Sequence, residues 1–220
     1  MTRPAVLFDL DGTLIESAGG IIANIRHAMQ VIGRPLDPDR DLTWAVGPPL
    51  RDIFARLLDG EDTALVAQAA ETYRLVYDSV GLLATVLYPG IAAALEAFGA
   101  GGWRVFVATS KPAGVARRIL TRLEAADRFE AIYGAVADGA LAHKPDLLGY
   151  LLVVQGLDPT STVMVGDRSF DIAGAHAHHV PGIGVLWGYG GRAELEQAGA
   201  DALAEAPGEL LHLAGSLLGR

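Results

Sequence analysis

The chain has 220 residues, a formal net charge of −9 and no cysteine. The negative charge argues against nucleic acid polymers and anionic membranes as partners, because their phosphates would be repelled, and the lack of cysteine excludes disulfide bonds and thiol catalysis. With 51% apolar residues, a chain of this length can form one sizeable core that carries an insertion, or two small domains.

The first predicted element is a buried strand over residues 5–8. It is followed directly by the segment DLDGT, residues 9–13. Open α/β sheets place reactive side chains at the carboxyl ends of their strands. Asp9 and Asp11 are two residues apart and point the same way on a strand, and Gly12 permits a tight turn. This pattern predicts a site at which an aspartate accepts a phosphoryl group.

The next predicted elements are helices, because apolar residues recur at helical spacing within residues 16–85 and no strand pattern interrupts them. This segment is therefore expected to be an all-helical insertion. The apolar window 80–95 is broken by Pro89 and Gly90 and falls short of a membrane span. No signal sequence is apparent either, so a cytoplasmic protein is expected. The helices are predicted over residues 20–32, 50–58 and 63–79.

From residue 86 onward strands and helices alternate, which predicts a parallel sheet with right-handed crossovers. The first strand is expected to join this sheet. The core domain is then discontinuous, with residues 1–15 and 86–220, and the fold class is α/β with a Rossmann-like parallel sheet and an inserted all-helical domain. Strands are predicted over residues 105–109, 131–136, 162–165 and 182–185. Helices are predicted over residues 91–98, 113–123, 145–155, 170–178 and 208–218.

Three further polar segments fall at predicted strand ends or turns, where a parallel sheet brings them to the same edge as the first. Lys111 and Lys144 within them are the only lysines among 17 basic residues, and each precedes a proline. A compact ammonium near a phosphate or an aspartate differs from a planar guanidinium. The segments are TSKP at 109–112, HKP at 143–145 and GDRSFD at 166–171.

Together the four segments resemble the four motifs of the haloacid dehalogenase superfamily, in its magnesium-dependent phosphatase branch and closest to the phosphoglycolate-phosphatase-like group. The resemblance extends to the helical insertion, to YPG at 88–90 and to GPPL at 47–50. It implies a helical cap domain over residues 16–85 and a phosphomonoester hydrolase that uses Mg²⁺. The implied partner is a small phosphorylated metabolite, with phosphoglycolate favoured.

By this resemblance Asp9 is the nucleophile that becomes aspartyl phosphate, and Asp11 is the general acid and then the general base. Carboxylates can attack phosphorus only when their charge is offset, as a divalent cation does. The resemblance assigns Mg²⁺ to Asp9, Asp167 and the backbone carbonyl of Asp11. Lys144 would neutralise charge on Asp9, and Asp171 would orient Lys144 or a metal-bound water.

The second segment is expected to bind phosphoryl oxygens through Thr109, the amide of Ser110 and Lys111. Each assignment has a simpler interpretation. Thr109 and Ser110 could only cap the helix that starts near residue 112, and Lys111 could only cover the surface. Asp167 and Asp171 could be a turn residue and a helix first-turn acid.

Specificity is expected to depend on the insertion, where Arg51 could bind an anionic substrate tail in bidentate fashion. Its simpler interpretation is a surface ion pair with Asp52 or Glu61.

Two other sequence patterns are not expected to take part in catalysis. The histidines at the end of the predicted helix 170–178 are in a place where cationic side chains are favoured, which makes a metal site there improbable. The segment WGYG at 187–190 is expected to form a rim loop beside the site. The histidines are His176, His178 and His179.

Other functions stay open at this point. A 5′-nucleotidase, a sugar-phosphate phosphatase or a phosphomutase of the same superfamily would share the motifs. A receiver-like protein that accepts phosphate stoichiometrically is the alternative outside enzymes, and a catalytically idle binding protein is a third. The insertion lacks lysine, which speaks against the phosphonate-cleaving relatives, and Asp11 speaks against the dehalogenases. The sequence does not predict the oligomeric state.

Overall fold

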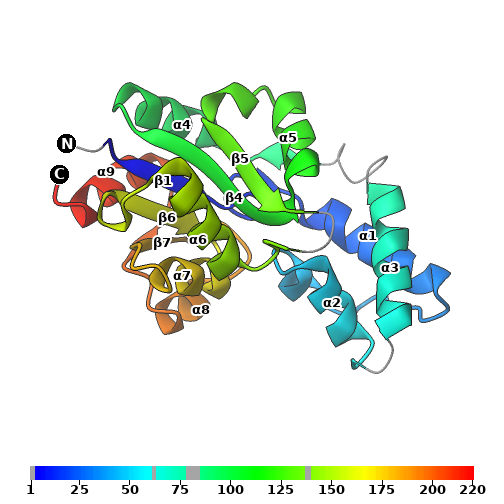
Figure 1. Cartoon of the computed structure of the whole chain (residues 1–220). Coiled ribbons are helices and arrows are strands. Elements are labelled where there is room, and N and C mark those ends of the chain that lie inside the picture. Colours follow the sequence, from blue (N-terminus) through cyan, green and yellow to red (C-terminus); the bar gives the residue numbers. More distant parts are fainter. Residues whose placement is uncertain (1–2, 61–62, 78–84, 137–139) are drawn as a thin grey trace. The chain divides into compact units, whose positions relative to one another are not determined.

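The computed structural model of the chain describes residues 3–60, 63–77, 85–136 and 140–220. The chain divides into two compact units (Figure 1). The core unit comprises Met1–Glu16 and Leu87–Arg220, and the inserted unit comprises Ser17–Val86.

The core unit contains a parallel sheet of six strands in the order β5-β4-β1-β6-β7-β8. Strand β1 lies inside the sheet, between β4 and β6, so the first strand of the chain joins the sheet that the second half builds. This confirms the predicted fold class. Both β1 and β6 are buried along their whole length, as expected for strands covered on both faces. The strands are β1 (Ala5–Phe8), β4 (Arg104–Pro112), β5 (Ala131–Ala135), β6 (Thr162–Gly166), β7 (Gly182–Val185) and β8 (Ala202–Ala204).

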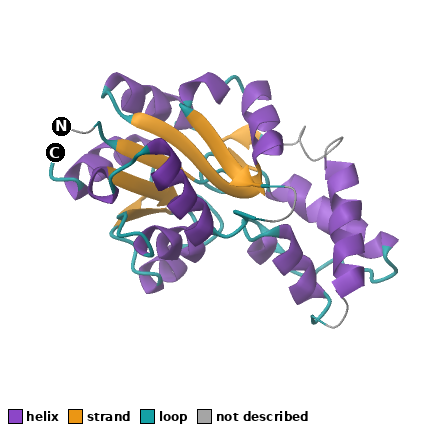
Figure 2. Cartoon of the chain, viewed as in Figure 1, coloured by secondary structure: helices purple, strands orange, loops and turns teal. Residues whose placement is uncertain are grey.

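Helices cover both faces of this sheet (Figures 1 and 2). On one face, Leu7 of β1 belongs to a buried cluster with leucines of α6. On the other face, Phe8 packs edge to face against Phe98 of α4, with ring centroids 5.6 Å apart. Successive residues of β1 thus serve opposite faces, as the pleat requires. The helices are α4 (Ile91–Ala100), α5 (Ala113–Arg122), α6 (Lys144–Gln155), α7 (Ser169–His176), α8 (Arg192–Gln197) and α9 (Leu210–Leu217).

Several elements differ from the sequence-based prediction. Helix α8 and strand β8 were not predicted, because α8 buries only Leu195 and β8 is too short to show alternation. Strand β4 continues to Pro112 instead of ending at Thr109, with a shift of register between those two residues. Such an irregularity re-aims the side chains around it. The last helix begins at Leu210 because residues 207–209 form a 3₁₀ turn.

The inserted unit is helical in its described residues, as predicted. Helices α1 and α2 both pack against α3, and Phe54 of α2 meets Tyr73 of α3 edge to face. The predicted end of the third helix at Ser79 lies outside the described residues. The helices are α1 (Ala18–Val31), α2 (Leu50–Leu57) and α3 (Thr63–Val76).

Where the chain passes from the core unit to the inserted unit and back, two short strands pair as a separate sheet. They are β2 (Ile15–Glu16) and β3 (Val86–Leu87). Among the helices of the described residues, none combines the length and the apolar composition that crossing a bilayer demands.

Packing of α6 against the sheet makes a direct prediction for stability. Leu148 of α6 is fully buried, whereas Val153 of the same helix is 81% exposed. Replacing Leu148→Ala should lower the free energy of unfolding by about 2–5 kcal/mol, because it removes buried methylene groups and leaves a cavity. Val153→Ala is the matched control and should change it by less than about 0.5 kcal/mol. Urea denaturation measures both, and equal effects would show that α6 does not pack as described.

Candidate active site

The polar segments at the strand ends come together at the carboxyl edge of the sheet. Asp9 follows β1, and its backbone amide still donates to the carbonyl of Val165 in β6 at 2.9 Å. Asp167 follows β6, and Thr109 lies on β4. Because β1 has β4 and β6 as its parallel neighbours, these residues share one edge of the sheet.

Lys144, the first residue of α6, is a buried cation at the centre of this group. Its Nζ lies 2.7 Å from Asp9 Oδ1, 2.7 Å from Asp171 Oδ1 and 2.6 Å from the carbonyl oxygen of Ala108. The three N–H groups of the ammonium thus face three oxygens. Burial alone would lower the pKa of Lys144, but the charges of Asp171 and Asp9 raise it above its usual value. Lys144 is therefore a permanent positive charge.

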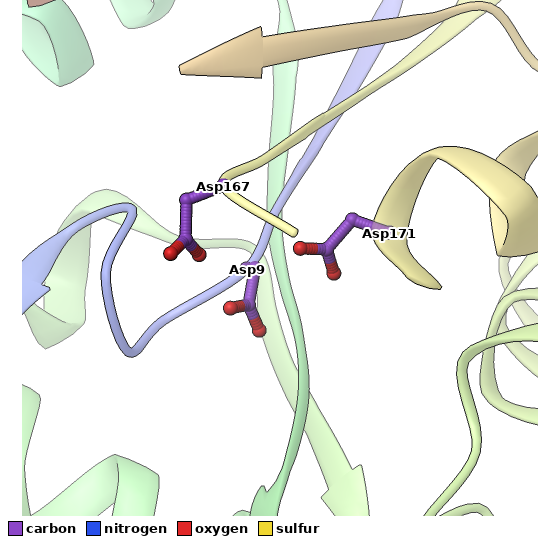
Figure 3. Close-up of side chains that lie close together, drawn as sticks. All are labelled: Asp9, Asp167 and Asp171. Carbon is purple, nitrogen blue, oxygen red and sulfur yellow. The ribbon is translucent and has the colours of Figure 1, made fainter. Parts of the chain in front are cut away.

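Three buried carboxylates, those of Asp9, Asp167 and Asp171, lie side by side and offer oxygens within 4.8 Å of one another (Figure 3). Burial raises the pKa of Asp9 to about 7, with Lys144 opposing the shift and Asp171 adding to it. Burial and the charges of Asp171 and Asp9 raise the pKa of Asp167 well above its usual value. When all three are ionised, these carboxylates therefore carry more negative charge than Lys144 balances.

An unpaired oxygen marks where a cation would complete this cluster. Asp9 Oδ2 is buried and has no hydrogen-bond partner among the described residues. A buried polar atom left unpaired is costly. Carboxylate oxygens are the ligands that hard divalent cations prefer. The residues present therefore fit a divalent metal ion.

Asp167 is held in place by the turn that follows β1 and by the loop that carries Tyr189. Its Oδ2 accepts a hydrogen bond from the amide of Tyr189 at 2.8 Å, and its Oδ1 accepts one from the Thr13 hydroxyl at 3.3 Å. Gly12 has a φ of +88°, and a Cβ at this position would lie 2.2 Å from Asp167 Oδ2. Only glycine satisfies both the backbone conformation and the close approach.

The side chain of Asp11 forms an ion pair with Lys111, whose Nζ lies 3.1 Å from Asp11 Oδ1. The two side chains are only 7% and 8% exposed. Lys111 therefore does not simply cover the surface, which was its simpler interpretation. The structure brings this lysine to the acid of the first motif.

Thr109 and Ser110 do not cap the following helix. Pro112 occupies the N-cap position of α5, and no side chain bonds there. The buried Thr109 hydroxyl instead accepts a hydrogen bond from the amide of Lys111 at 3.2 Å. Ser110 follows on β4 and is partly buried. Both residues thus belong to the strand end and not to the helix.

Asp171 is a first-turn acid of its helix and also contacts Lys144, two interpretations that the sequence analysis gave as alternatives. Its Oδ2 accepts a hydrogen bond from the amide of Arg168 at the start of α7, as a first-turn acid does. Its Oδ1 lies 2.7 Å from Lys144 Nζ, and the carboxylate also belongs to the three-acid cluster.

The three histidines do not gather around a common point. His176 pairs with Asp201 at 2.9 Å, and His178 bonds the carbonyl oxygen of Pro145 at 2.7 Å. His179 follows the end of α7 with a φ of +57°. Within the described residues, the only cluster of metal-ligating side chains is the three-acid group.

Arg51 lies on α2 of the inserted unit and is exposed. One of its two alternative partners, Glu61, lies outside the described residues. Its part in substrate selection therefore stays a prediction.

The sequence analysis did not predict that Trp187 and Tyr189 bond to residues of the candidate site. The indole of Trp187 donates to the carbonyl oxygen of Thr13 at 3.0 Å, and Tyr189 donates its amide to Asp167. The expected rim loop is therefore bonded directly to the site. The alternation of glycine with Trp187 and Tyr189 was the available signal, because glycines allow a backbone to approach closely.

Comparison with known proteins agrees with this geometry. The sequence pattern of the family described as haloacid dehalogenase-like hydrolase matches residues 6–185. The chain belongs to this family. A crystal structure described as a predicted phosphatase from Clostridium acetobutylicum superposes with a TM-score of 0.90 at 32% identity, covering 100% of both chains. The superfamily predicted from the four motifs is thereby confirmed.

Three relatives carry different names. Tyrosine-protein kinase PtkA of Mycobacterium tuberculosis is 42% identical over 84% of this chain and 62% of its own length. The chain thus spans less than two thirds of that relative. A 5′-nucleotidase of Pseudomonas aeruginosa is 40% identical over 87% of this chain and 86% of its own length. A phosphoglycolate phosphatase of Cereibacter sphaeroides is 31% identical over 79% and 81%, as the predicted resemblance to that group requires.

The charge imbalance predicts how stability depends on pH in metal-free protein. The pKa of Asp9 rises from 3.8 to about 7 on folding, so the folded state binds more protons between these values. Stability then falls as pH rises through this window. The midpoint of thermal unfolding should be higher at about pH 5.5 than at about pH 8, and Mg²⁺ should raise it more at the higher pH.

Scanning calorimetry on wild type, Asp9→Asn and Asp127→Asn measures this effect. Asp127 is an exposed acid of the same unit, so its variant should show the wild-type decrease of the unfolding midpoint with pH. In Asp9→Asn this decrease should be smaller. A metal-free midpoint that rises between the two pH values would contradict the shifted pKa of Asp9.

Proposed function

We propose that this chain hydrolyses phosphate monoesters of small metabolites through a transient aspartyl phosphate on Asp9. The supporting observation is how the two oxygens of the Asp9 carboxylate are surrounded. Lys144 binds Oδ1, while Oδ2 is buried, unpaired and adjacent to two further acids. Relatives named as a 5′-nucleotidase and a phosphoglycolate phosphatase support the same reaction class.

In the first step, an Asp9 oxygen attacks phosphorus, and the bond from phosphorus to the leaving alcohol breaks. Asp11 gives a proton to the leaving oxygen. In the second step, water attacks phosphorus, Asp11 takes a proton from that water, and Asp9 and inorganic phosphate are released. Lys144 is fixed beside Asp9 before the reaction starts, so it offsets charge without reorganisation.

We propose Mg²⁺ as the cofactor, held by Asp9, Asp167 and the backbone carbonyl of Asp11, with Asp171 beside them. Bound Mg²⁺ supplies positive charge that reduces the repulsion between a carboxylate nucleophile and a phosphate ester. Thr109 and the amide of Ser110 bind phosphoryl oxygens.

The proposed substrates are nucleoside 5′-monophosphates and phosphoglycolate, because relatives of both names are similar over most of their lengths. A sugar phosphate remains the alternative, hydrolysed or isomerised. A cytoplasmic location stays a prediction. A stoichiometric receiver is disfavoured because the family is one of hydrolases.

The PtkA relative, 42% identical, favours a second candidate function. In that function ATP would be the donor and ADP the leaving group of the first step, and the phosphoryl group on Asp9 would then pass to a tyrosine hydroxyl, whose proton Asp11 takes. Incubation with ATP, followed by separate measurement of phosphotyrosine and free phosphate, distinguishes the two acceptors. Phosphotyrosine on added protein with little free phosphate would favour the transferase.

Asp9→Asn tests the central assignment. An amide is a far weaker nucleophile than a carboxylate, so the rate of p-nitrophenyl phosphate hydrolysis with Mg²⁺ should fall by at least about a thousandfold. Asp127→Asn, with the same chemical change on the surface, should keep the wild-type rate. An Asp9→Asn variant with more than a trace of activity would show that another group attacks. Multiple turnovers by wild type would exclude the receiver.

Arg51→Ala tests whether the insertion selects anionic substrates. Loss of a charge-assisted hydrogen bond should raise KM for phosphoglycolate by roughly tenfold, with little change for p-nitrophenyl phosphate, which lacks a second anionic group. Arg74→Ala is the control, because Arg74 is an exposed arginine of the same unit that pairs with Glu71. Equal changes for both substrates would remove Arg51 from substrate selection.

A further inference from the structure

Tyr189 connects the acid cluster with both ends of the inserted segment. Its amide donates to Asp167 Oδ2 at 2.8 Å, and its hydroxyl donates to Glu16 Oε1 at 3.2 Å. The hydroxyl of Tyr88 forms a side-chain hydrogen bond with Tyr189 as well. One residue therefore contacts a carboxylate of the candidate metal site and two residues outside it.

Those two residues mark where the chain leaves and re-joins the core unit. Glu16 is the last residue of β2, and Tyr88 follows directly after β3. The amide of Tyr88 donates to the carbonyl oxygen of Leu14 at 3.0 Å. The two connecting segments are thus bonded to each other as well as to Tyr189.

The loop that carries Tyr189 lies against Asp167 without any space for larger residues. A Cβ at Gly188 would lie 2.3 Å from Asp167 Cβ, and one at Gly190 would lie 2.1 Å from the Asp167 carbonyl oxygen. Trp187 fixes the same loop through its bond to the carbonyl oxygen of Thr13. A displacement of this loop toward Asp167 would collide with that residue, and a displacement away from it would break the amide bond to the carboxylate.

We propose that Tyr189 is a positioning residue whose hydroxyl bonds keep its amide on Asp167, so that the two connecting segments and the metal ligand are coupled. The amide bonds Oδ2, and the Thr13 hydroxyl bonds Oδ1, so both oxygens of the Asp167 carboxylate are oriented by hydrogen bonds. The metal part of this inference rests on the proposed function, whereas the hydrogen-bonded connection does not.

Burial and the bond to Tyr189 raise the pKa of Tyr88, so the Tyr88 phenol remains neutral at physiological pH. The connecting segments and Asp167 affect each other, because coupling between two sites is reciprocal. Whatever moves the segments at Glu16 and Tyr88 changes the orientation of Asp167. A cation on Asp167 in turn restrains those segments.

Amide hydrogen exchange in metal-free protein tests the connection without reference to activity. Tyr189→Phe keeps the ring and the amide and removes only the hydroxyl. Exchange at residue 189 should accelerate by about tenfold or more, because the loop opens more often. Glu16→Ala should act similarly, whereas Glu16→Gln keeps an acceptor and should restore wild-type protection.

Tyr133→Phe is the matched control, since its hydroxyl is also hydrogen-bonded, to Gln155, but far along the sheet from Asp167. Unchanged exchange at residue 189 in Tyr189→Phe and Glu16→Ala, or equal acceleration in Tyr133→Phe, would overturn the proposal. Loss of protection in Glu16→Gln equal to that in Glu16→Ala would overturn it too.

Calorimetric titration with MgCl₂ alone measures the consequence at the metal site. Loss of a group that orients a metal ligand should raise the Kd for Mg²⁺ by roughly tenfold in Tyr189→Phe, with no change in Tyr133→Phe. An unchanged Kd would overturn the coupling to the metal ligand. Should wild type bind no Mg²⁺, the metal assignment of the proposed function fails, while the exchange experiment still decides whether Tyr189 positions Asp167.

Discussion

The buried ammonium of Lys144 is what allows acidic side chains to lie close together where water is excluded. Removing a carboxylate from water is expensive unless an opposite charge and hydrogen bonds compensate. Lys144 faces Asp9 and Asp171 at 2.7 Å each, so a single positive charge is shared by two of the three acids. The folded site is thus left with a deficit of positive charge. That deficit is what gives it an affinity for a cation.

The parallel sheet supplies the rest of the arrangement. Its strands end at one edge, and the residue after β1 is therefore a neighbour of the residue after β6, although the two are far apart in the sequence. The close contacts between the turns and helices around the charged side chains depend on glycine. Gly12 lets the first turn touch Asp167, and Gly174 lets α7 approach Lys144, where a Cβ would lie 2.6 Å from the lysine Cβ. Small residues thus set the distances at which the charges interact.

The sequence predicts the parallel sheet and most of the polar segments of the candidate site, because these depend on local sequence pattern. A short apolar run followed by two acids locates a strand end, and the Lys-Pro pairs locate two further places in the same sheet. What the pattern does not contain is the identity of bonding atoms. The pairing of Lys111 with Asp11 and the amide bond from Tyr189 to Asp167 arise from packing between distant segments. Strand β8 escaped prediction because three residues carry too little periodicity.

The pairing of β2 with β3 has a consequence for how this architecture diversifies. Because the inserted segment starts and ends at adjacent backbone positions, its length hardly affects the entropy of closing the loop, which grows by only about 0.6 kcal/mol for each doubling. Evolution can exchange one insert for another, larger or smaller, and leave the sheet untouched. New substrates then become accessible to an unchanged reaction centre by replacement of a single contiguous stretch of the gene.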